Sequence, residues 1–486
     1  MKVPRVIIVG AGMAGRALAR EYAEKPNKGQ VIAFLDDDPK KIGTKAEGID
    51  VLGPIDSMAD WLEAELAVIA IPSATKGQLR EIVQSLKRNF NLSIRILPSL
   101  NQIIDGEAHL ALTRELDPQD LLGRNPVRIN LKQSLAYLRG KRVLITGAGG
   151  SIGSELARQL LSGGAERLYL LGHGENSIYN IEKELRELQK EGVGEKAIVV
   201  PIIGDLRDKE WINFLLGRLK AHIIFHAAAH KHVPMMEHNP VECVINNVWS
   251  TIHLVEAAKK YHVQRFVLIS TDKAVSPTSI YGATKKIAEE VVLSANQTDS
   301  APLFMVVRFG NVLGSRGSIL PLFKQQILAG GPITITHPEA KRYFMTIPEA
   351  ASLVLQTGGV GAGGQLYLLD MGEPISICEL ARQMTQFYNK TPERDIPIEY
   401  IGLREGEKLI EKLWEDWEDV VPTEFPRINR IVRRRNPVGL EEFLETVKAI
   451  CFFDPLNPKM YRNRAMLRQA LRIYIPSVED KHEPEY

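Results

Sequence analysis

The sequence predicts an α/β fold made of two doubly wound parallel-sheet domains in tandem, the second with a smaller C-terminal substrate-binding cap. Two segments carry this prediction. One starts at Arg5 and reads Arg-Val-Ile-Ile-Val-Gly-Ala-Gly-Met-Ala-Gly, and the other starts at Arg142 and reads Arg-Val-Leu-Ile-Thr-Gly-Ala-Gly-Gly-Ser-Ile-Gly. Each is a short apolar run that ends in glycines and precedes a helix-like stretch, which is how a nucleotide-binding βαβ unit begins. The repetition therefore marks the starts of two Rossmann-like domains.

The first domain is expected over residues 1–125. Strand-like runs alternate there with polar helical stretches such as Lys76–Lys87, a pattern typical of a parallel sheet with helices on its faces. After the first strand, we expect strands at Val31–Leu35, Ala67–Ile71 and Ile94–Leu97. A connector containing Asp-Pro and Asn-Pro dipeptides follows, and we place a linker at residues 126–140.

The second domain is expected over residues 141–420. Its predicted strands are Val143–Thr146, Arg167–Leu171, Ala197–Ile203, Ala221–His226, Arg265–Ser270 and Leu303–Arg308. After about residue 315 the alternation becomes irregular, with glycine-rich breaks, which predicts the cap. Residues 421–486 begin Pro- and Arg-rich and then become helical, so we expect a C-terminal helical extension.

Composition and charge exclude several classes of protein. Of 486 residues, 44% are hydrophobic and 25% charged, and the net charge is +2, which is ordinary for a globular protein and gives no general attraction to nucleic acid or an acidic membrane. The three cysteines, Cys243, Cys378 and Cys451, form no CxxC pair, which argues against a disulfide framework or a cysteine zinc site. No apolar stretch approaches the ~18 residues that span a bilayer. We therefore expect a cytoplasmic protein with no membrane span in this chain and no nucleic-acid partner.

The second glycine motif is the stronger cofactor signal. Gly147, Gly150 and Gly153 fall at its first, fourth and seventh positions, around Ser151 and Ile152. Glycines there let the backbone turn tightly and present amide N–H groups at a helix N-terminus to a pyrophosphate. Two later strands end in residues that suit the same cofactor. Asp205-Leu206 offers a carboxylate to an adenine amino group, and Ala227-Ala228 is small enough for a cofactor to lie flat over the sheet.

Acid–base residues follow the next strand. Thr271-Asp272-Lys273 ends it, and Tyr281 and Lys285 stand four residues apart, on one face of a helix. An ammonium beside a phenol lowers the phenol's pKa, so we expect a tyrosinate that removes an alcohol proton near neutral pH. The order of glycines, strand-end Asp, Ala run and Tyr-x-x-x-Lys makes chance an unlikely source of the pattern.

A further set of motifs indicates a family. They are Gly174-Glu-Asn-Ser177, His226-Ala-Ala-Ala-His-Lys231-His-Val-Pro234, Asn239-Pro-Val-Glu242, Asn246-Asn247-Val, Ser270-Thr-Asp-Lys-Ala274, Arg308-Phe-Gly-Asn311-Val-Leu-Gly-Ser and Leu403-Arg404-Glu-Gly-Glu407-Lys408. With them, residues 141–420 resemble the extended short-chain dehydrogenase/reductase superfamily and, within it, the UDP-N-acetylglucosamine 4,6-dehydratases of polysaccharide biosynthesis. Residues 1–125 resemble the extra nucleotide-binding-like domain that long members carry.

The resemblance implies roles residue by residue. Tyr281, Lys285 and Thr271 would handle the C4 hydroxyl and the nicotinamide ribose, Asp272 would protonate the departing C6 oxygen, and Lys273 would take the C5 proton. The residues expected to bind the substrate are Lys231, Asn247, Asn311, Arg404 and Glu407. The product would be a UDP-4-keto-6-deoxy-N-acetylhexosamine. The cofactor would stay tightly bound and be recycled, and no metal would be required.

Three departures from the family pattern keep alternatives open. After Leu171 stands Gly-His-Gly instead of an acidic residue, so NADP is at least as good a candidate as NAD and we place it slightly ahead. Many long members carry Met at the position of Tyr281, which leaves the C5 stereochemistry of the product open. Long members commonly begin with membrane-spanning helices, so we expect either a naturally soluble form or a trimmed one.

The histidine cluster and the basic cluster each have an ordinary structural explanation. His226, His230, His232 and His238 match no metal-ligand spacing, and Arg430–Arg435 is interpreted as a solvated or interface face instead of an RNA site. The N-terminal set of Gly10, Gly12, Gly15 and Asp36 forms a full dinucleotide fingerprint. Since no catalytic set accompanies it, we expect a degenerate or regulatory nucleotide site there.

Three functions remain from the sequence. The leading one is a UDP-N-acetylglucosamine 4,6-dehydratase. A UDP-sugar 4-epimerase would share the glycines and Tyr281/Lys285 but would have little use for Asp272 and Lys273. A non-catalytic nucleotide-binding or regulatory protein would need none of these four residues. We expect a homo-oligomer, since extended members of the superfamily usually pair through the helices beside the Tyr-x-x-x-Lys.

Overall fold

The computed structural model describes residues 3–57, 63–87, 92–97, 113–116, 135–296, 302–388, 390–434 and 439–479. It divides into two compact units, Met1–Gln133 with Arg186–Glu195, and Ser134–Leu185 with Lys196–Tyr486. Most of the expected linker, residues 126–134, lies outside the described residues. We describe each unit by itself.

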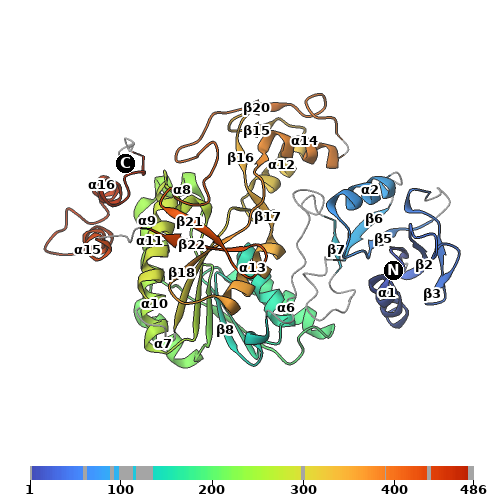
Figure 1. Ribbon diagram of the computed structural model, residues 1–486, viewed down its shortest axis with the longest axis horizontal. Helices are drawn as coiled ribbons and strands as arrows, with labels where there is room; N and C mark the ends of the chain where they lie inside the picture. The colour runs from blue at the N-terminus through green and yellow to red at the C-terminus, as the bar shows by residue number, and fades with distance from the viewer. Residues whose placement is uncertain are drawn as a thin grey trace. The chain divides into compact units, whose positions relative to one another are not determined.

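The N-terminal unit is a mostly parallel sheet with strand order β3-β4-β2-β1-β5-β6-β7 (Figure 1). Only the edge strands β3 and β7 pair antiparallel to their neighbours. Its described elements are β1 (Arg5–Val9), α1 (Met13–Glu24), β2 (Gln30–Leu35), β3 (Lys45–Ala46), β4 (Ile49–Leu52), β5 (Leu66–Ile69), α2 (Lys76–Leu86), β6 (Ser93–Ile96) and β7 (Arg114–Glu115). The predicted α/β class is confirmed for this unit, and the four predicted strands form its parallel core.

The larger unit is built on a nine-stranded sheet of order β10-β9-β8-β11-β12-β13-β18-β22-β21. Helices α7, α10 and α11 lie on one side of the sheet and α6 and α13 on the other (Figure 1). In chain order the elements are β8 (Arg142–Thr146), α5 (Ser151–Ser162), β9 (Arg167–Gly172), α6 (Glu175–Lys190), β10 (Ile198–Ile203), α7 (Lys209–Leu219), β11 (Ile223–His226), α8 (Val233–His238), α9 (Pro240–Val244), α10 (Ser250–Lys260), β12 (Arg265–Ile269), α11 (Ile280–Ser294), β13 (Leu303–Arg308), α13 (Ile347–Val360) and β18 (Gln365–Leu369).

The central strands of this sheet are buried on both faces, whereas the edge strand β10 is partly exposed. β8, β11 and β13 are apolar almost throughout, and Phe225, Phe266 and Phe304 are fully buried. A strand covered on both faces reads as a continuous apolar run, which is why the central strands could be predicted from sequence. Because the strands are parallel, the residues that follow β8, β10, β11 and β12 meet at one edge of the sheet, where ligands bind in open α/β folds.

The cap consists of short elements inserted after β13. Three pairs of strands make small two-stranded sheets, and helices α12 (Ile319–Leu328) and α14 (Ile377–Phe387) lie with β15, β16 and β20 at the top of Figure 1. The pairs are β14 (Asn311–Leu313) with β17 (Phe344–Thr346), β15 (Ile333–Ile335) with β20 (Ile398–Tyr400), and β16 (Lys341–Arg342) with β19 (Ile375–Ser376). The irregular alternation after residue 315 corresponds to this insertion.

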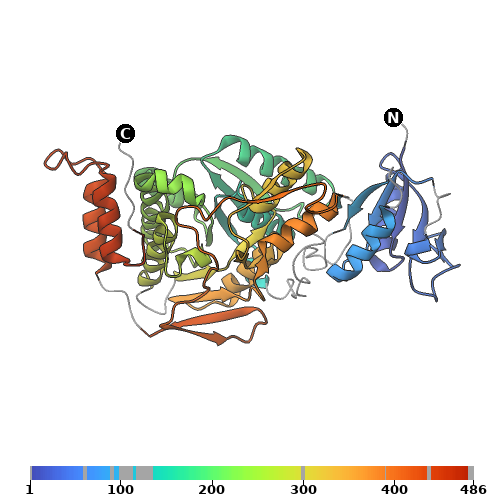
Figure 2. The same ribbon diagram turned by 90° about the horizontal axis from the view of Figure 1, so that it is seen from above.

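The boundary expected at residue 420 cuts through a hairpin of the large sheet. Strands β21 (Glu418–Pro422) and β22 (Ile428–Arg433) pair with each other, and β22 pairs antiparallel with β18. The catalytic sheet therefore extends to Arg433. Helices α15 (Leu440–Cys451) and α16 (Arg464–Tyr474) follow and lie on the side of the unit where α9 and α11 are (Figures 1 and 2). None of the helices within the described ranges is both long and apolar enough to cross a membrane.

Candidate active site

The glycine-rich turn after β8 is shaped to hold a pyrophosphate. Gly147 has a φ of +65°, and a Cβ there would lie 2.8 Å from the Cα of Ala228. A Cβ on Gly153 would lie 2.2 Å from the Gly147 carbonyl oxygen, so helix α5 packs directly on the turn. Gly150, the N-cap of α5, supplies no side-chain cap, which leaves the amides of the first turn, including Ser151 and Ile152, available to an anion. The predicted cofactor-binding glycines thus meet at one place.

An arginine that the sequence interpretation missed lies on this turn. The Arg316 guanidinium donates to the Gly149 carbonyl at 2.9 Å, and the Arg316 amide donates to Ser151 Oγ at 3.1 Å. A guanidinium beside the N-terminus of α5 adds a charge of the sign that phosphate oxygens need. Arg316 is 165 residues from Ser151, so no local pattern links the two.

Asp205 is also positioned at this edge, and by a second missed arginine. Arg207 Nε donates to Asp205 Oδ2 at 2.8 Å, and Arg207 also donates to Glu242 at 2.6 Å. These hydrogen bonds hold the pKa of Asp205 below its ordinary value. The carboxylate is therefore ionised and fixed in orientation at neutral pH. Leu206 is buried directly after it.

His226, the first residue of the histidine cluster, is bonded to two hydroxyl groups. His226 is fully buried between the hydroxyls of Thr146 (2.7 Å) and Thr251 (3.0 Å), and burial lowers the pKa of His226 to about 3. It is thus a neutral core histidine. Across the described parts of the chain, no group of three or more His, Cys, Asp or Glu side chains is arranged to hold a metal ion.

Asp272 and Lys273 form a buried acid–base pair at the end of β12. Asp272 is 0% exposed, and Lys273 Nζ donates to its Oδ1 at 3.0 Å. Thr271 Oγ1 donates to the same oxygen at 2.9 Å, while Asp272 Oδ2 has no hydrogen-bond partner among the residues that the structure describes. Burial opposes the charge on Lys273, but the carboxylates of Asp272 and Glu411 outweigh it and hold the pKa of Lys273 above its ordinary value.

Glu411 is a further residue that the sequence interpretation missed. It is buried in the segment after the Arg404–Lys408 motif, and its Oε1 lies 3.8 Å from Lys273 Nζ. Its other oxygen lies 3.6 Å from Lys408 Nζ. Lys273 therefore stands between two buried carboxylates, and Asn311 Oδ1 accepts a third contact from it at 3.0 Å.

Tyr281 lies beside this pair, and its activation by Lys285 stays a prediction, because other groups act on the phenol in this structure. Burial raises the pKa of Tyr281 to about 12, and the charge that lowers it is that of Lys273, together with a side-chain hydrogen bond between Tyr281 and Thr271. Lys285 Nζ instead donates to the Ile269 carbonyl at 2.7 Å, and burial lowers the pKa of Lys285 to about 8. Spacing put both side chains on one face of α11, but it could not show where the ammonium binds.

The shifted pKa of Lys285 predicts a pH-dependent stability difference. Between about pH 8 and its ordinary 10.5, the unfolded chain holds the Lys285 proton and the folded chain does not, so this group makes the free energy of unfolding rise with pH across that window. We expect Lys285→Met to remove that dependence. Relative to wild type, the variant should gain stability at pH 7 by up to about 3 kcal/mol, less about 1 kcal/mol for the lost hydrogen bond.

Urea denaturation at several pH values between 7 and 10 measures this difference. The gap between Lys285→Met and wild type should shrink as the pH rises. Lys260→Met, at an exposed position on α10, is the matched control and should show a gap that does not depend on pH. A constant gap for Lys285→Met would contradict a buried lysine that titrates near pH 8.

The predicted substrate residues separate into two groups. Lys231 and Asn311 lie near the acid–base pair. Lys231 Nζ donates to the Arg316 carbonyl at 2.6 Å, and burial, together with the charge of Lys273, lowers the pKa of Lys231. Asn247 has another role, because its amide is consumed inside the protein by the backbone of His230 (2.8 and 3.0 Å) and by Thr284. It fixes the turn after β11 and does not present free groups to a substrate.

Arg404 and Glu407 lie on one loop of the cap. Glu407 Oε1 accepts from Arg342 at 3.1 Å, and its Oε2 lies 3.9 Å from Arg404 Nε. Arg342 is buried and also donates to the Leu409 carbonyl. The Arg404 side chain is about half exposed, so its guanidinium can reach a ligand while Glu407 holds the loop.

The acidic residue of the N-terminal glycine set is bonded to the backbone of that set. A Cβ on Gly15 would lie 1.9 Å from the Gly10 carbonyl oxygen, the same close approach as in the larger unit. Asp36, however, is buried, and its carboxylate accepts from the Ala11 amide at 2.7 Å and from Lys41 Nζ at 3.0 Å. Asp36 therefore stabilises the turn, and its carboxylate is already bonded within the protein. Gly12, the N-cap of α1, has no side-chain cap, so the glycine part of the second nucleotide site stays a prediction.

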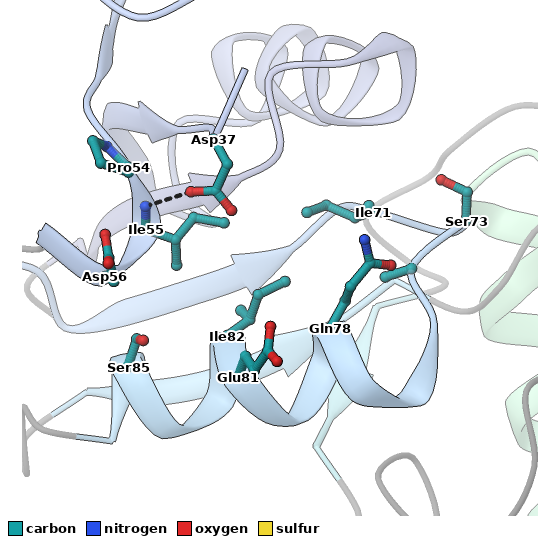
Figure 3. A pocket seen from close by; sticks show the side chains of 11 residues that line it. Asp37, Pro54, Ile55, Asp56, Ile71, Ser73, Gln78, Glu81, Ile82 and Ser85 are labelled. Atoms are coloured by element: carbon teal, nitrogen blue, oxygen red, sulfur yellow. Dashed lines mark hydrogen bonds between the residues drawn. The ribbon is translucent and has the colours of Figure 1, made fainter. Parts of the chain in front are cut away.

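A cavity of about 760 Å³ lies near this set, between the ends of β2, β4 and β5 and helix α2 (Figure 3). Asp37, Asp56 and Glu81 are among its described lining residues, none of which is basic. The Asp37 carboxylate already accepts from the Ile55 amide at 2.8 Å, as Figure 3 shows. The described lining of the cavity therefore offers no cation to a polyphosphate.

Comparisons with known proteins agree with this geometry. A family profile described as a polysaccharide biosynthesis protein matches residues 143–433, and one described as a CoA-binding domain matches residues 1–84. The chain is 43% identical over 412 residues to the capsular polysaccharide biosynthesis protein CapD of Staphylococcus aureus, covering 84% of this chain and 68% of CapD.

Named enzymes are also among the relatives. The chain is 31% identical over 275 residues to a UDP-N-acetylglucosamine 4,6-dehydratase (inverting) of Campylobacter jejuni, covering 56% of this chain and 77% of that protein. It is 31% identical over 284 residues to a UDP-glucose 4-epimerase of Rickettsia rickettsii, with the same coverage. The X-ray structure of Pen from Bacillus thuringiensis is 32% identical, with a TM-score of 0.56, covering 61% of this chain and 91% of that chain.

The profile match covers more than half of the chain and includes the glycine turn, the acid–base pair and the cap loop. The protein is thus an enzyme of the dehydratase and epimerase kind. It belongs to the polysaccharide-biosynthesis family of the extended short-chain dehydrogenase/reductase superfamily, as the sequence motifs indicated.

Proposed function

We propose that the protein catalyses the NAD(P)-dependent 4,6-dehydration of UDP-N-acetylglucosamine to a UDP-4-keto-6-deoxy-N-acetylhexosamine for surface polysaccharide or glycan synthesis. One observation carries this proposal: the Asp272–Lys273 pair, buried beside Tyr281. Removal of water across C5 and C6 needs an acid for the departing oxygen and a base for the C5 proton. Tyr281 and Thr271 alone would serve only the C4 hydroxyl.

The Asp272–Lys273 pair can supply both the acid and the base, because transfer of one proton from Lys273 to Asp272 creates them together. At rest, Lys273 is an ammonium and Asp272 accepts its hydrogen bond at 3.0 Å. Transfer of one proton along this bond gives a neutral amine, which accepts the C5 proton, and a carboxylic acid, which protonates the C6 oxygen as water departs. Glu411, 3.8 Å from Lys273, keeps the resting pair charged and stabilises the ammonium that re-forms.

The residues around the glycine turn suit a dinucleotide cofactor. Gly150 leaves the N-terminus of α5 without a side-chain cap, Arg316 lies beside it, and a side chain on Gly147 would clash with Ala228. When bound, the nicotinamide would accept hydride from C4 and return it to C6, so the net reaction is a dehydration with no net oxidation. His173, which follows β9 where an acidic residue would exclude a 2′-phosphate, supports NADP as well as NAD.

The cap loop supports a UDP-linked substrate. The half-exposed Arg404 guanidinium offers a planar fork of donors that fits phosphate oxygens, and Glu407 holds its loop against Arg342. The relative named as a UDP-N-acetylglucosamine 4,6-dehydratase supports the N-acetylglucosamine moiety. Lys231 and Asn311, both near Lys273, are proposed to contact the sugar.

A UDP-sugar 4-epimerase is the second candidate, favoured by relatives that carry that name at the same 31% identity. Incubation with UDP-N-acetylglucosamine, followed by proton NMR, separates the two. We expect a new C6 methyl doublet together with loss of the C4 proton signal. Conversion to the galacto isomer without a methyl signal would establish the epimerase instead.

The compartment and the assembly are part of the proposal. We propose a cytoplasmic enzyme that forms a homo-oligomer through the helices beside Tyr281. Helix α9 of that layer packs against α15 and α16 of the same chain, so part of the surface is already covered. Size-exclusion chromatography with light scattering tests the assembly.

A further inference from the structure

The residues after the sheet hairpin contact the active site from outside the family profile, which ends at residue 433. We name residues 464–479, helix α16 and the chain that follows it, the C-terminal strap. Some of its polar contacts reach residues 274–280, the joining segment between Lys273 and Tyr281, either directly or through Glu237. Figures 1 and 2 both show α16 on the side of the unit where α9 and α11 lie.

The principal contact is a buried ion pair. Arg468 on α16 is 7% exposed, and Glu237 on α8 is 4% exposed. Arg468 donates from one guanidinium nitrogen to Glu237 Oε2 at 2.9 Å and from the other to the Glu237 carbonyl at 2.8 Å. Two parallel donors fix the orientation of Glu237 as well as its position.

Glu237 also bonds to the first residue of α11, the helix that carries Tyr281. Its other oxygen, Oε1, accepts from the backbone amide of Ile280 at 2.7 Å. Ile280 is the first residue of α11, so its amide has no partner within the helix, and Tyr281 follows directly. The series Arg468, Glu237 and the Ile280 amide therefore sets where the helix that carries Tyr281 begins.

The end of the strap holds the joining segment itself. Ser477 Oγ donates to the Pro277 carbonyl at 2.9 Å, and the Glu479 amide donates to the Thr278 carbonyl at 3.3 Å. From the opposite direction, Thr278 Oγ1 donates to the carbonyl of Gly406 at 3.1 Å, in the loop of Arg404. The joining segment is thus fixed between the strap and the substrate loop.

We propose that the C-terminal strap is a positioning element of the active site, in which Arg468 acts through Glu237 to hold Tyr281 in register with Asp272 and Lys273. The catalytic consequence rests on the proposed function. Removing the guanidinium leaves a buried carboxylate without its cation, so Glu237 must move toward water or change partners and release the Ile280 amide. A displacement of about 1 Å at a catalytic group can cost about a hundredfold in rate.

Arg468→Gln tests the proposal in the full-length enzyme. We expect kcat with UDP-N-acetylglucosamine to fall by about 10- to 100-fold while KM changes less than about threefold. Backbone amides in peptides covering residues 275–284 should exchange with deuterium about tenfold faster. Combining Glu237→Gln with Arg468→Gln should recover most of the wild-type kcat and most of the wild-type protection from exchange. The reason is that the amide oxygen of the glutamine still accepts from the Ile280 amide and needs no cation. Arg472→Gln, at an exposed position one turn along α16, is the matched control.

Three results would overturn the proposal. One is wild-type exchange of residues 275–284 in Arg468→Gln. Another is a loss of kcat that follows only the loss of folded protein, measured by thermal unfolding. The third is a double variant whose kcat and amide exchange are the same as those of Arg468→Gln alone. If the wild-type enzyme does not convert UDP-N-acetylglucosamine, the proposed function fails, but the exchange measurement still decides whether the strap orders the start of α11.

Discussion

Replacing Lys273 by methionine is expected to lower turnover of UDP-N-acetylglucosamine by about a thousandfold or more, since general acid–base groups contribute about 10²–10⁴ each. Methionine keeps much of the buried volume but removes the only group placed to take the C5 proton in the proposed reaction. It also leaves Asp272, which is 0% exposed, without the ammonium that bonds it at 3.0 Å. Thr271 still bonds the same oxygen at 2.9 Å, so the carboxyl group stays in place and the base is the group that is lost.

The measurement is the C6 methyl signal in proton NMR, combined with absorbance of the reduced nicotinamide. The variant should still remove hydride from C4, so reduced cofactor should accumulate while no methyl signal forms. Lys412→Met is the control, since Lys412 is 58% exposed and pairs with Asp416 at 3.1 Å on the surface. If Lys273→Met keeps a tenth of wild-type turnover, Lys273 is not the base.

The parts of the molecule predicted from sequence are those set by neighbouring residues. Strand β8 is an apolar β-branched run and its turn needs glycine at φ +65°, so both are visible in a short window. Thr271, Asp272 and Lys273 are adjacent in the chain and end a strand. For such groups, chain order and the parallel sheet suffice to bring them to one edge.

The partners that set the protonation of these groups were missed, because they are distant in sequence. Glu411 reaches Lys273 from the cap, and Arg316 reaches Ser151 across 165 residues. The strap contact between Arg468 and Glu237 spans 231 residues. A single glutamate or arginine in a polar segment carries no signal of its partner.

Where the structure differs from the expectations, the differences share one physical cause, which is that spacing does not report burial or competing hydrogen bonds. Tyr281 and Lys285 are correctly placed on one helix face, but burial raises the pKa of the phenol and Ile269 takes the ammonium. Asp36 follows its strand as a dinucleotide fingerprint requires, yet the Ala11 amide occupies its carboxylate. Asn247 is likewise consumed by the backbone of His230.

A buried ion network behind the active site is expected to have the largest effect on stability. Arg308, at the end of β13, is 0% exposed and donates to Glu289 and to Glu418 at 2.8 Å each, and both carboxylates are also 0% exposed. Arg433 lies 3.5 Å from each. We expect Arg308→Met to lower the free energy of unfolding by about 3–5 kcal/mol, because two buried carboxylates lose their principal cation.

Chemical denaturation, followed by a probe in the larger unit, measures this loss. Arg434→Met, at an exposed arginine that pairs with Asp419 at 2.6 Å, is the control and should change the free energy of unfolding far less, because solvent screens a surface ion pair. Adding Glu289→Gln and Glu418→Gln to Arg308→Met should recover part of the stability, since the two buried carboxylates are then neutral amides and the remaining cation, Arg433, is 12% exposed. An Arg308→Met protein within about 1 kcal/mol of wild type would show that the network contributes little.

The same network links stability to pH and to the active site. Burial opposes ionisation of Glu289, but Arg308 outweighs it and holds the pKa of Glu289 below its ordinary value. The stabilising contribution of Glu289 is therefore present at neutral pH and is lost as the pH falls through its folded-state pKa. The free energies of unfolding of wild type and Arg308→Met should accordingly converge at acid pH. Ser270 Oγ donates to Glu289 at 2.6 Å and directly precedes Thr271. We accordingly expect Arg308→Met to lower kcat as well, even at temperatures where the variant stays folded.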